Sequence, residues 1–196
     1  SDVCSSDLAT AVLKNLLKSS ADNYYNWRFG KVYYKKKGHG SPVLLIHDLT
    51  VYSSAYEWNK VVNELAEAHT VYAIDLLGCG RSEKPRITYT NYLYVQLIAD
   101  FIKNIIGEKT DVIASGYSGS FTVLASYTNP EFINKIVLIN PPSLASLNKV
   151  PSKRSKLYKF ILEFPIFGTL IYNIKTCQSN IQLLFTEKYL YNPFSV

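Results

Sequence analysis

The chain has 196 residues, of which 47% are hydrophobic and 18% charged. This is the composition of one globular domain with a sizeable core, and it excludes disordered, collagen-like and coiled-coil proteins. Lysine and arginine number 21 against 15 aspartate and glutamate, a net charge of +6. The excess is modest and scattered, so we expect a solvated basic face and no nucleic-acid partner.

The cysteines and the two ends of the chain indicate where the protein is located and whether the sequence is complete. Three cysteines form neither a metal-binding spacing nor a disulfide framework, which favours a reducing cytoplasm. No apolar run reaches the roughly 18 residues of a membrane span, and no signal-peptide pattern is visible at the start. Residues 1–8 resemble a translated sequencing adapter, which we interpret as a non-native tail, and we interpret the rest as a fragment of a longer gene.

Hydrophobic periodicity predicts the elements in chain order. In the first half, a helix is predicted over residues 9–19, a strand over 27–37 and a turn over 38–42. A buried strand over 43–46, a helix over 58–66 and a second buried strand over 71–74 follow. Short continuous apolar runs are typical of strands covered on both faces. Apolar residues at every third or fourth position mark the helices.

The second half continues the alternation. A helix is predicted over residues 93–106, stopped by Gly107, and a buried strand over 112–114. A helix over 121–127 and another buried strand over 136–139 follow. Buried strands alternating with helices predict an α/β fold with a mostly parallel sheet and helices on both faces. Ligands bind beyond the carboxyl ends of such strands. The segments of interest are therefore residues 47–50, 75–82, 115–120 and 140–142.

These four segments together resemble the α/β-hydrolase family. The family commonly has an apolar strand, His-Gly, a loop and a helix-opening tryptophan, matched here by Ile46-His47-Asp48 and Trp58. It then has a strand ending in Asp and a Gly-x-Gly-x-Ser loop, matched by Asp75 and Gly78-Cys79-Gly80-Arg81-Ser82. The resemblance implies that residues 9–150 are the N-terminal part of an α/β-hydrolase core, incomplete at the C-terminus. Residues 151–196 resemble the start of a helical cap, broken into short pieces by Pro165 and Gly168.

The resemblance implies a nucleophile on a tight strand-to-helix turn, a histidine base and an orienting carboxylate. In Gly116-Tyr117-Ser118-Gly119-Ser120, the pattern G-x-S-x-small makes Ser118 the candidate nucleophile. Its oxyanion would then be bound by the backbone N–H groups of Leu49 and Gly119. Counting back from Asn129-Pro130 gives a second register, in which Gly116 holds the nucleophile position and Tyr117 supplies the second N–H. Both registers stay open.

Two departures from the family pattern bear on function. The histidines are His39, His47 and His69, whereas the family's catalytic histidine follows the cap, so this chain lacks that base. His47 resembles the family's loop-shaping motif histidine. Asp48 replaces the family's glycine beside the oxyanion loop, where its carboxylate either opposes catalysis or turns away to cap a loop.

Two function classes follow. The parent protein is predicted to hydrolyse a small, largely apolar ester or related bond by a Ser-His-acid mechanism. The alternative is a non-catalytic homologue that binds a small ligand or a partner protein in the same pocket. No cofactor or metal is expected, because no motif for nucleotide, flavin or metal occurs. Asp75 is expected to be structural and Cys79 to pack as a small hydrophobic residue.

Overall fold

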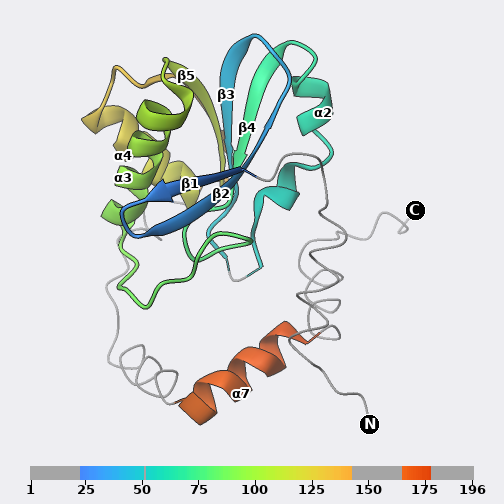
Figure 1. Cartoon of the computed structure of the whole chain (residues 1–196), viewed down its shortest axis with the longest axis vertical. Coiled ribbons are helices and arrows are strands. Elements are labelled where there is room, and N and C mark those ends of the chain that lie inside the picture. The colour runs from blue at the N-terminus through green and yellow to red at the C-terminus, as the bar shows by residue number, and fades with distance from the viewer. Residues whose placement is uncertain (1–22, 51, 143–164, 178–196) are drawn as a thin grey trace. The chain divides into compact units, whose positions relative to one another are not determined.

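A computed structural model describes residues 23–50, 52–142 and 165–177. The helix predicted at residues 9–19 lies outside these ranges. Contacts divide the chain into a compact unit of residues 19–147 and a second unit formed by residues 1–18 and 148–196. The first unit contains a six-stranded sheet of order β1-β2-β4-β3-β5-β6 (Figure 1). The strands, in chain order, are Asn23–Trp27, Gly30–Lys37, Ser41–Ile46, His69–Ile74, Thr110–Ser115 and Ile133–Ile139.

Strand directions confirm the predicted mostly parallel sheet. β3 pairs in parallel with β4 and β5, and β5 with β6. The strand predicted over residues 27–37 is confirmed for residues 30–37, which form β2. Its first three positions are wrong, because β1 and β2 form an antiparallel hairpin in which Trp27 pairs with Gly30. Arg28 and Phe29 make the two-residue turn. Gly30 has φ +147°, a conformation that side chains disfavour.

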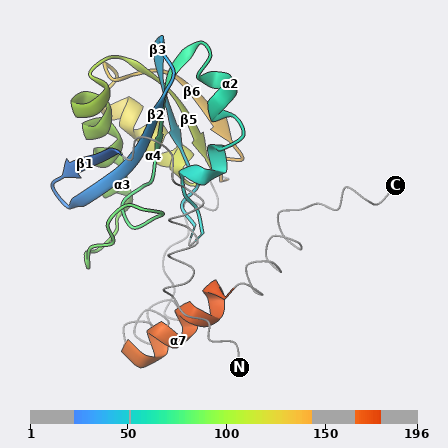
Figure 2. The same cartoon turned by 45° about the vertical axis from the view of Figure 1, so that its right-hand side comes forward.

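Helices cover both faces of the sheet, as Figures 1 and 2 show. One face packs against α3 (Asn91–Phe101), its π-helical continuation η2 (Ile102–Ile106) and α4 (Ser118–Thr128). The other packs against the 3-10 turn η1 (Ala55–Trp58) and α2 (Val62–Leu65). The continuous helix predicted over residues 58–66 is wrong. Ser54 caps a separate 3-10 turn that buries Trp58, and the chain turns again before α2.

The apolar strand predicted at residues 43–46 explains how both faces are filled. Leu44 and Ile46 belong to the core under α3 and α4, whereas Val43 and Leu45 belong to the core under η1 and α2. Successive side chains of a strand point to opposite faces. A strand covered twice therefore needs an apolar residue at every position, which confirms the interpretation of the continuous run.

Two further predictions are wrong. The apolar run of β6 predicts a buried strand, but Val137 is 51% exposed and Leu138 and Ile139 are each 39% exposed. Gly168 is predicted to break a helix, but it lies inside α7 (Pro165–Thr176). Proline is tolerated at a first helical position, and one interior glycine costs only about 1 kcal/mol. Within the described residues, no helix is both long and apolar enough to cross a membrane.

The exposed strand β6 predicts self-association. A sheet edge with apolar side chains invites pairing with another chain. We expect the purified chain to associate with rising concentration and Val137→Lys to weaken association by about tenfold, the loss of one buried valine. Light scattering after size-exclusion chromatography measures this. Val123→Lys is the control, because Val123 is 48% exposed on α4 rather than at the sheet edge. An equal effect of both substitutions would contradict edge pairing.

Candidate active site at the carboxyl ends of the parallel strands

The predicted site segments meet where the parallel strands end. His47 and Asp48 follow β3, Asp75 follows β4, and Gly116 follows β5. These three strands are neighbours in the sheet. Hydrogen bonds join the segment after β3 to each of the other two, so residues separated by up to 71 positions in sequence become direct partners.

The turn between β5 and α4 has its left-handed residue at Gly116. Gly116 has φ +54°, and its N–H donates to the Ile139 carbonyl at 2.9 Å. A Cβ at this position would overlap the carboxylate of Asp48. A side chain at Gly116 would therefore face both backbone strain and a collision.

Ser118, the candidate nucleophile of the first register, lies two residues beyond this glycine. It is the first residue of α4 and is 0% exposed. Its Oγ donates a hydrogen bond to the His47 carbonyl at 2.5 Å. The hydroxyl therefore ties α4 to the end of β3.

Asp48 brings together the two N–H groups of the second register. Its Oδ1 accepts from the Leu49 N–H at 2.7 Å and from the Tyr117 N–H at 2.8 Å. The Gly119 N–H, the donor of the first register, donates instead to the Gly116 carbonyl at 3.1 Å. Of the two orientations that the sequence leaves open for Asp48, the structure has the one in which the carboxylate points at the N–H pair.

His47 fixes the end of β3 to the end of β4. Its Nε2 accepts from the Leu76 N–H at 2.9 Å, so Nδ1 carries the proton and donates to the Asp48 carbonyl at 2.6 Å. The ring is fully buried. Burial lowers the pKa of His47, although the hydrogen bond to Asp48 and the nearby carboxylates of Asp75, Glu57 and Asp48 oppose that shift. His47 is therefore a neutral positioning group, and both ring nitrogens are engaged.

Asp75 is a second buried anchor. Its Oδ1 accepts from the Ala55 N–H at 2.6 Å and its Oδ2 from the Arg81 N–H at 2.7 Å. Its carbonyl accepts from the buried Ser82 hydroxyl at 2.6 Å. The carboxylate thus joins the first residue of η1 to the Gly-x-Gly-x-Ser loop after β4, a structural arrangement. Sequence reasoning missed Glu57, whose Oε2 accepts from the Asp48 N–H at 3.1 Å; its spacing from Asp48 carried no motif.

Cys79 packs against the core, as expected for a small hydrophobic residue. Burial and the charge of Asp75 raise the pKa of its thiol to about 11. At neutral pH it is a thiol rather than the reactive thiolate. In the described part of the chain, no group of three or more His, Cys, Asp or Glu residues is arranged to hold a metal ion.

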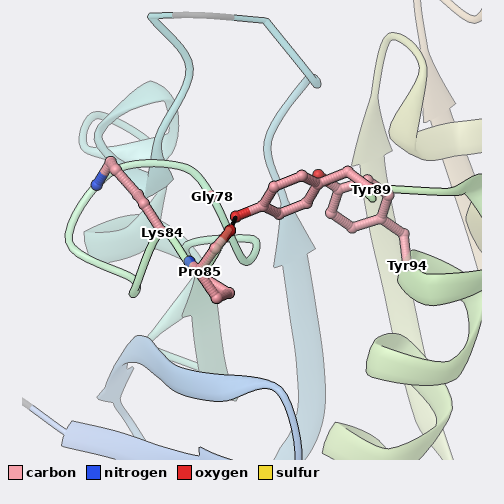
Figure 3. A pocket seen from close by; sticks show the side chains of 5 residues that line it. All are labelled: Gly78, Lys84, Pro85, Tyr89 and Tyr94. Carbon is pink, nitrogen blue, oxygen red and sulfur yellow. Dashed lines mark hydrogen bonds between the residues drawn. The ribbon is translucent and has the colours of Figure 1, made fainter. Parts of the chain in front are cut away.

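An open hollow of about 290 Å³ lies beside the loop after β4 (Figure 3). It is lined by Gly78, Lys84, Pro85, Tyr89 and Tyr94. The rings of Tyr89 and Tyr94 stack with centroids 6.4 Å apart. Their hydroxyls donate to the carbonyls of Pro85 and Leu77. The Lys84 ammonium donates to the Gly80 and Ser82 carbonyls at 2.7 and 3.2 Å, so its charge serves the loop.

A mostly parallel sheet with helices on both faces and a tight turn after its fifth strand defines the class of α/β hydrolases. The chain belongs to the alpha/beta hydrolase family, whose sequence profile matches residues 43–179. Among solved structures, the chain superimposes on an epoxide hydrolase, CorEH, with a TM-score of 0.64 and 23% identity, over 84% of this chain and 58% of that one. It also superimposes on an α/β-hydrolase-fold protein from Burkholderia ambifaria with a TM-score of 0.63 and 20% identity, over 76% of this chain and 55% of that one.

Curated relatives include enzymes. The chain is 29% identical over 110 residues to a soluble epoxide hydrolase of Corynebacterium sp. strain C12, covering 56% of this chain and 38% of the relative. It is 33% identical over 114 residues to 2-hydroxy-6-oxo-6-(2'-aminophenyl)hexa-2,4-dienoic acid hydrolase of Metapseudomonas resinovorans, covering 57% and 39%. The chain thus spans well under half the length of these curated relatives.

The buried neutral His47 predicts a loss of stability in acid. Its pKa is lowered in the folded state, so below the ordinary pKa of about 6.5 the unfolded chain binds the extra proton. The contribution of the neutral His47 ring to the free energy of unfolding is complete above about pH 6.5. Below that pH it falls by at most about 1.4 kcal/mol for each pH unit. Urea unfolding at pH 7.5 and 5.5 measures it. His47→Gln should lose about 1–3 kcal/mol at pH 7.5 and show a smaller pH dependence; an unchanged pH dependence would contradict this role.

The contact between Gly116 and Asp48 predicts coupled substitutions. Gly116→Ala should cost more than Gly107→Ala, because Gly107 also has positive φ (+78°) but nothing lies within 4 Å of its Cβ position. Strain alone costs about 1–2 kcal/mol, and overpacking adds about 1–3 kcal/mol. In an Asp48→Gly background, Gly116→Ala should lower the free energy of unfolding no more than Gly107→Ala does. Urea unfolding of the four proteins in the cycle measures the coupling, and additive costs would argue against the contact.

Proposed function

We propose that this α/β-hydrolase-family chain belongs to a protein that binds a small ligand without a nucleophile at the strand-to-helix turn. The observation that carries this proposal is the positive φ of Gly116, +54°. The nucleophile of such a fold stands at the strained position of this turn. In the second register that position is Gly116, which has no side chain to attack a substrate.

The environment of Ser118 supports this proposal. A serine nucleophile needs an accessible Oγ and a base that accepts its proton. The Ser118 hydroxyl is fully buried and donates to a backbone carbonyl. His47, the nearest motif histidine, has both ring nitrogens engaged with backbone groups.

Asp48 supports the same conclusion by charge. Catalysis of acyl transfer places N–H donors where negative charge develops on the substrate. Here the N–H groups of Leu49 and Tyr117 both donate to a carboxylate oxygen. A substrate carbonyl would have to displace that oxygen and accept a negative charge beside it.

The second candidate function is the hydrolysis of a small, largely apolar ester or related bond through Ser118. The likeness to the Corynebacterium epoxide hydrolase and the Metapseudomonas dienoic acid hydrolase favours it. It requires a histidine base and an acid at the family's positions after the cap, and residues 70–196 contain no histidine. For either candidate we propose a small-molecule ligand and a cytoplasmic location, on the low cysteine content.

Covalent labelling separates the two candidates. The full-length protein should carry no adduct after treatment with a fluorophosphonate probe, because the turn offers no nucleophile. Mass spectrometry of the intact protein and of the peptide containing Ser118 measures this. An active serine hydrolase treated in parallel confirms that the probe reacts. An adduct on Ser118 that disappears in Ser118→Ala would overturn the binding proposal and establish the hydrolase.

A further inference from the structure

Three aromatic rings form a ladder that ends at the open hollow beside the loop after β4. The rings of Phe121 on α4 and Tyr94 on α3 have centroids 5.2 Å apart and planes inclined by 20°. Tyr89 continues the ladder from Tyr94, at 6.4 Å and 22°. Tyr94 is 4% exposed, whereas Tyr89 is 38% exposed. Tyr89 is therefore the ring of the ladder that a molecule from solvent can reach.

The Tyr89 side chain is held in place although it is partly exposed. Its hydroxyl donates to the Pro85 carbonyl at 2.9 Å. Its ring lies against Gly78, where an added Cβ would come within 2.9 Å of the Tyr89 Cε1 atom. An aromatic side chain that is already fixed loses little conformational freedom when a second ring stacks on it. Tyr89 is thus a prepared surface for a flat ring.

Lys84 forms the wall of the hollow opposite the two tyrosines, with Gly78 and Pro85 between them (Figure 3). An ammonium group has three N–H donors, and two of those of Lys84 donate to the carbonyls of Gly80 and Ser82. These acceptors are neutral, and among the described residues no carboxylate forms an ion pair with Lys84. The positive charge of this wall is therefore not neutralised by a carboxylate of the described residues.

The loop around the hollow is basic as a whole. Residues 78–89 contain one acidic residue, Glu83, and three basic residues, Arg81, Lys84 and Arg86. The Glu83 carboxylate accepts from the Lys31 N–H of β2 at 2.8 Å. Burial raises the pKa of both tyrosine hydroxyls of the hollow, so neither of them adds a negative charge at neutral pH. The surroundings consequently favour an anion over a cation.

We propose that this hollow binds a small aromatic ring that carries one carboxylate, with the ring stacked on Tyr89 and the carboxylate directed towards Lys84. The volume of about 290 Å³ is at the lower end of the range for ligand pockets, which suits a single substituted ring. None of the lining residues takes part in the contact between Asp48 and Tyr117. The inference therefore goes beyond the proposed function and does not depend on whether the turn after β5 holds a nucleophile.

Titration of the chain with three probes, followed by NMR, tests the proposal. Benzoate should shift the amide resonances of Gly78 and Tyr89 saturably, with an affinity of about millimolar, as expected for one ring in an open site. Its ring protons should show intermolecular NOEs to the Tyr89 ring. Cyclohexanecarboxylate keeps the charge but lacks a flat ring, and benzyl alcohol keeps the ring but lacks the charge. Each should bind about threefold or more weakly than benzoate.

Two pairs of variants assign the binding to the two walls. Tyr89→Leu should weaken benzoate binding about threefold to tenfold, because it removes the stacking ring and keeps an apolar side chain. Tyr92→Leu is its control, since Tyr92 is 61% exposed and does not line the hollow. Lys84→Met should weaken binding about threefold and reduce its dependence on salt. Arg86→Met is its control, because it removes the same charge from an exposed position of the same loop.

Several results would overturn the proposal. One is the absence of saturable benzoate shifts at Gly78 and Tyr89 in the wild-type chain. Equal binding of benzoate and cyclohexanecarboxylate is another, and equal weakening by Tyr89→Leu and Tyr92→Leu is a third. Thermal unfolding shows whether each variant is folded, and should Tyr89→Leu fail to fold, the three probes on the wild-type chain decide alone. Labelling of Ser118 by the fluorophosphonate probe would leave this result untouched.

Discussion

One carboxylate oxygen organises the loops at this end of the sheet. Asp48 Oδ1 accepts N–H groups from its own loop and from the turn after β5, so it joins two segments that strand pairing alone leaves separate. The bond requires that Gly116 have no side chain. The loop after β3 and the turn after β5 are thereby held together by a contact of the protein with itself.

Two buried polar residues make that contact possible by setting where the loops begin. His47 links the end of β3 to the end of β4, and Asp75 links the start of η1 to the loop after β4. Each uses both of its polar side-chain atoms on backbone groups. Because unsatisfied buried polar groups are costly, these residues hold the loops in the arrangement in which Asp48 and Tyr117 meet.

The fold and the site carry different information about function. The family assignment and the superpositions establish an α/β-hydrolase scaffold, and that scaffold supports many chemistries. The features that bear on function lie at a few positions: a glycine at the left-handed turn residue, a serine buried on a backbone carbonyl, and an aspartate on the N–H pair. Our proposal of ligand binding rests on these positions and not on the fold.

The amino-acid pattern was enough to predict the parallel strands, since the apolar runs of β3 and β4 can be satisfied only by cover on both faces. It also predicted which segments follow the strands, and so which residues compose the candidate site. It could not place the β1–β2 turn, the break before α2 or the exposure of β6, because these depend on pairing and cover by distant parts of the chain. Nor could it choose between Ser118 and Gly116 or orient Asp48. The left-handed residue of a turn and the direction of a carboxylate are decided by contacts across 69 positions of sequence, which are brought together only when the chain is folded.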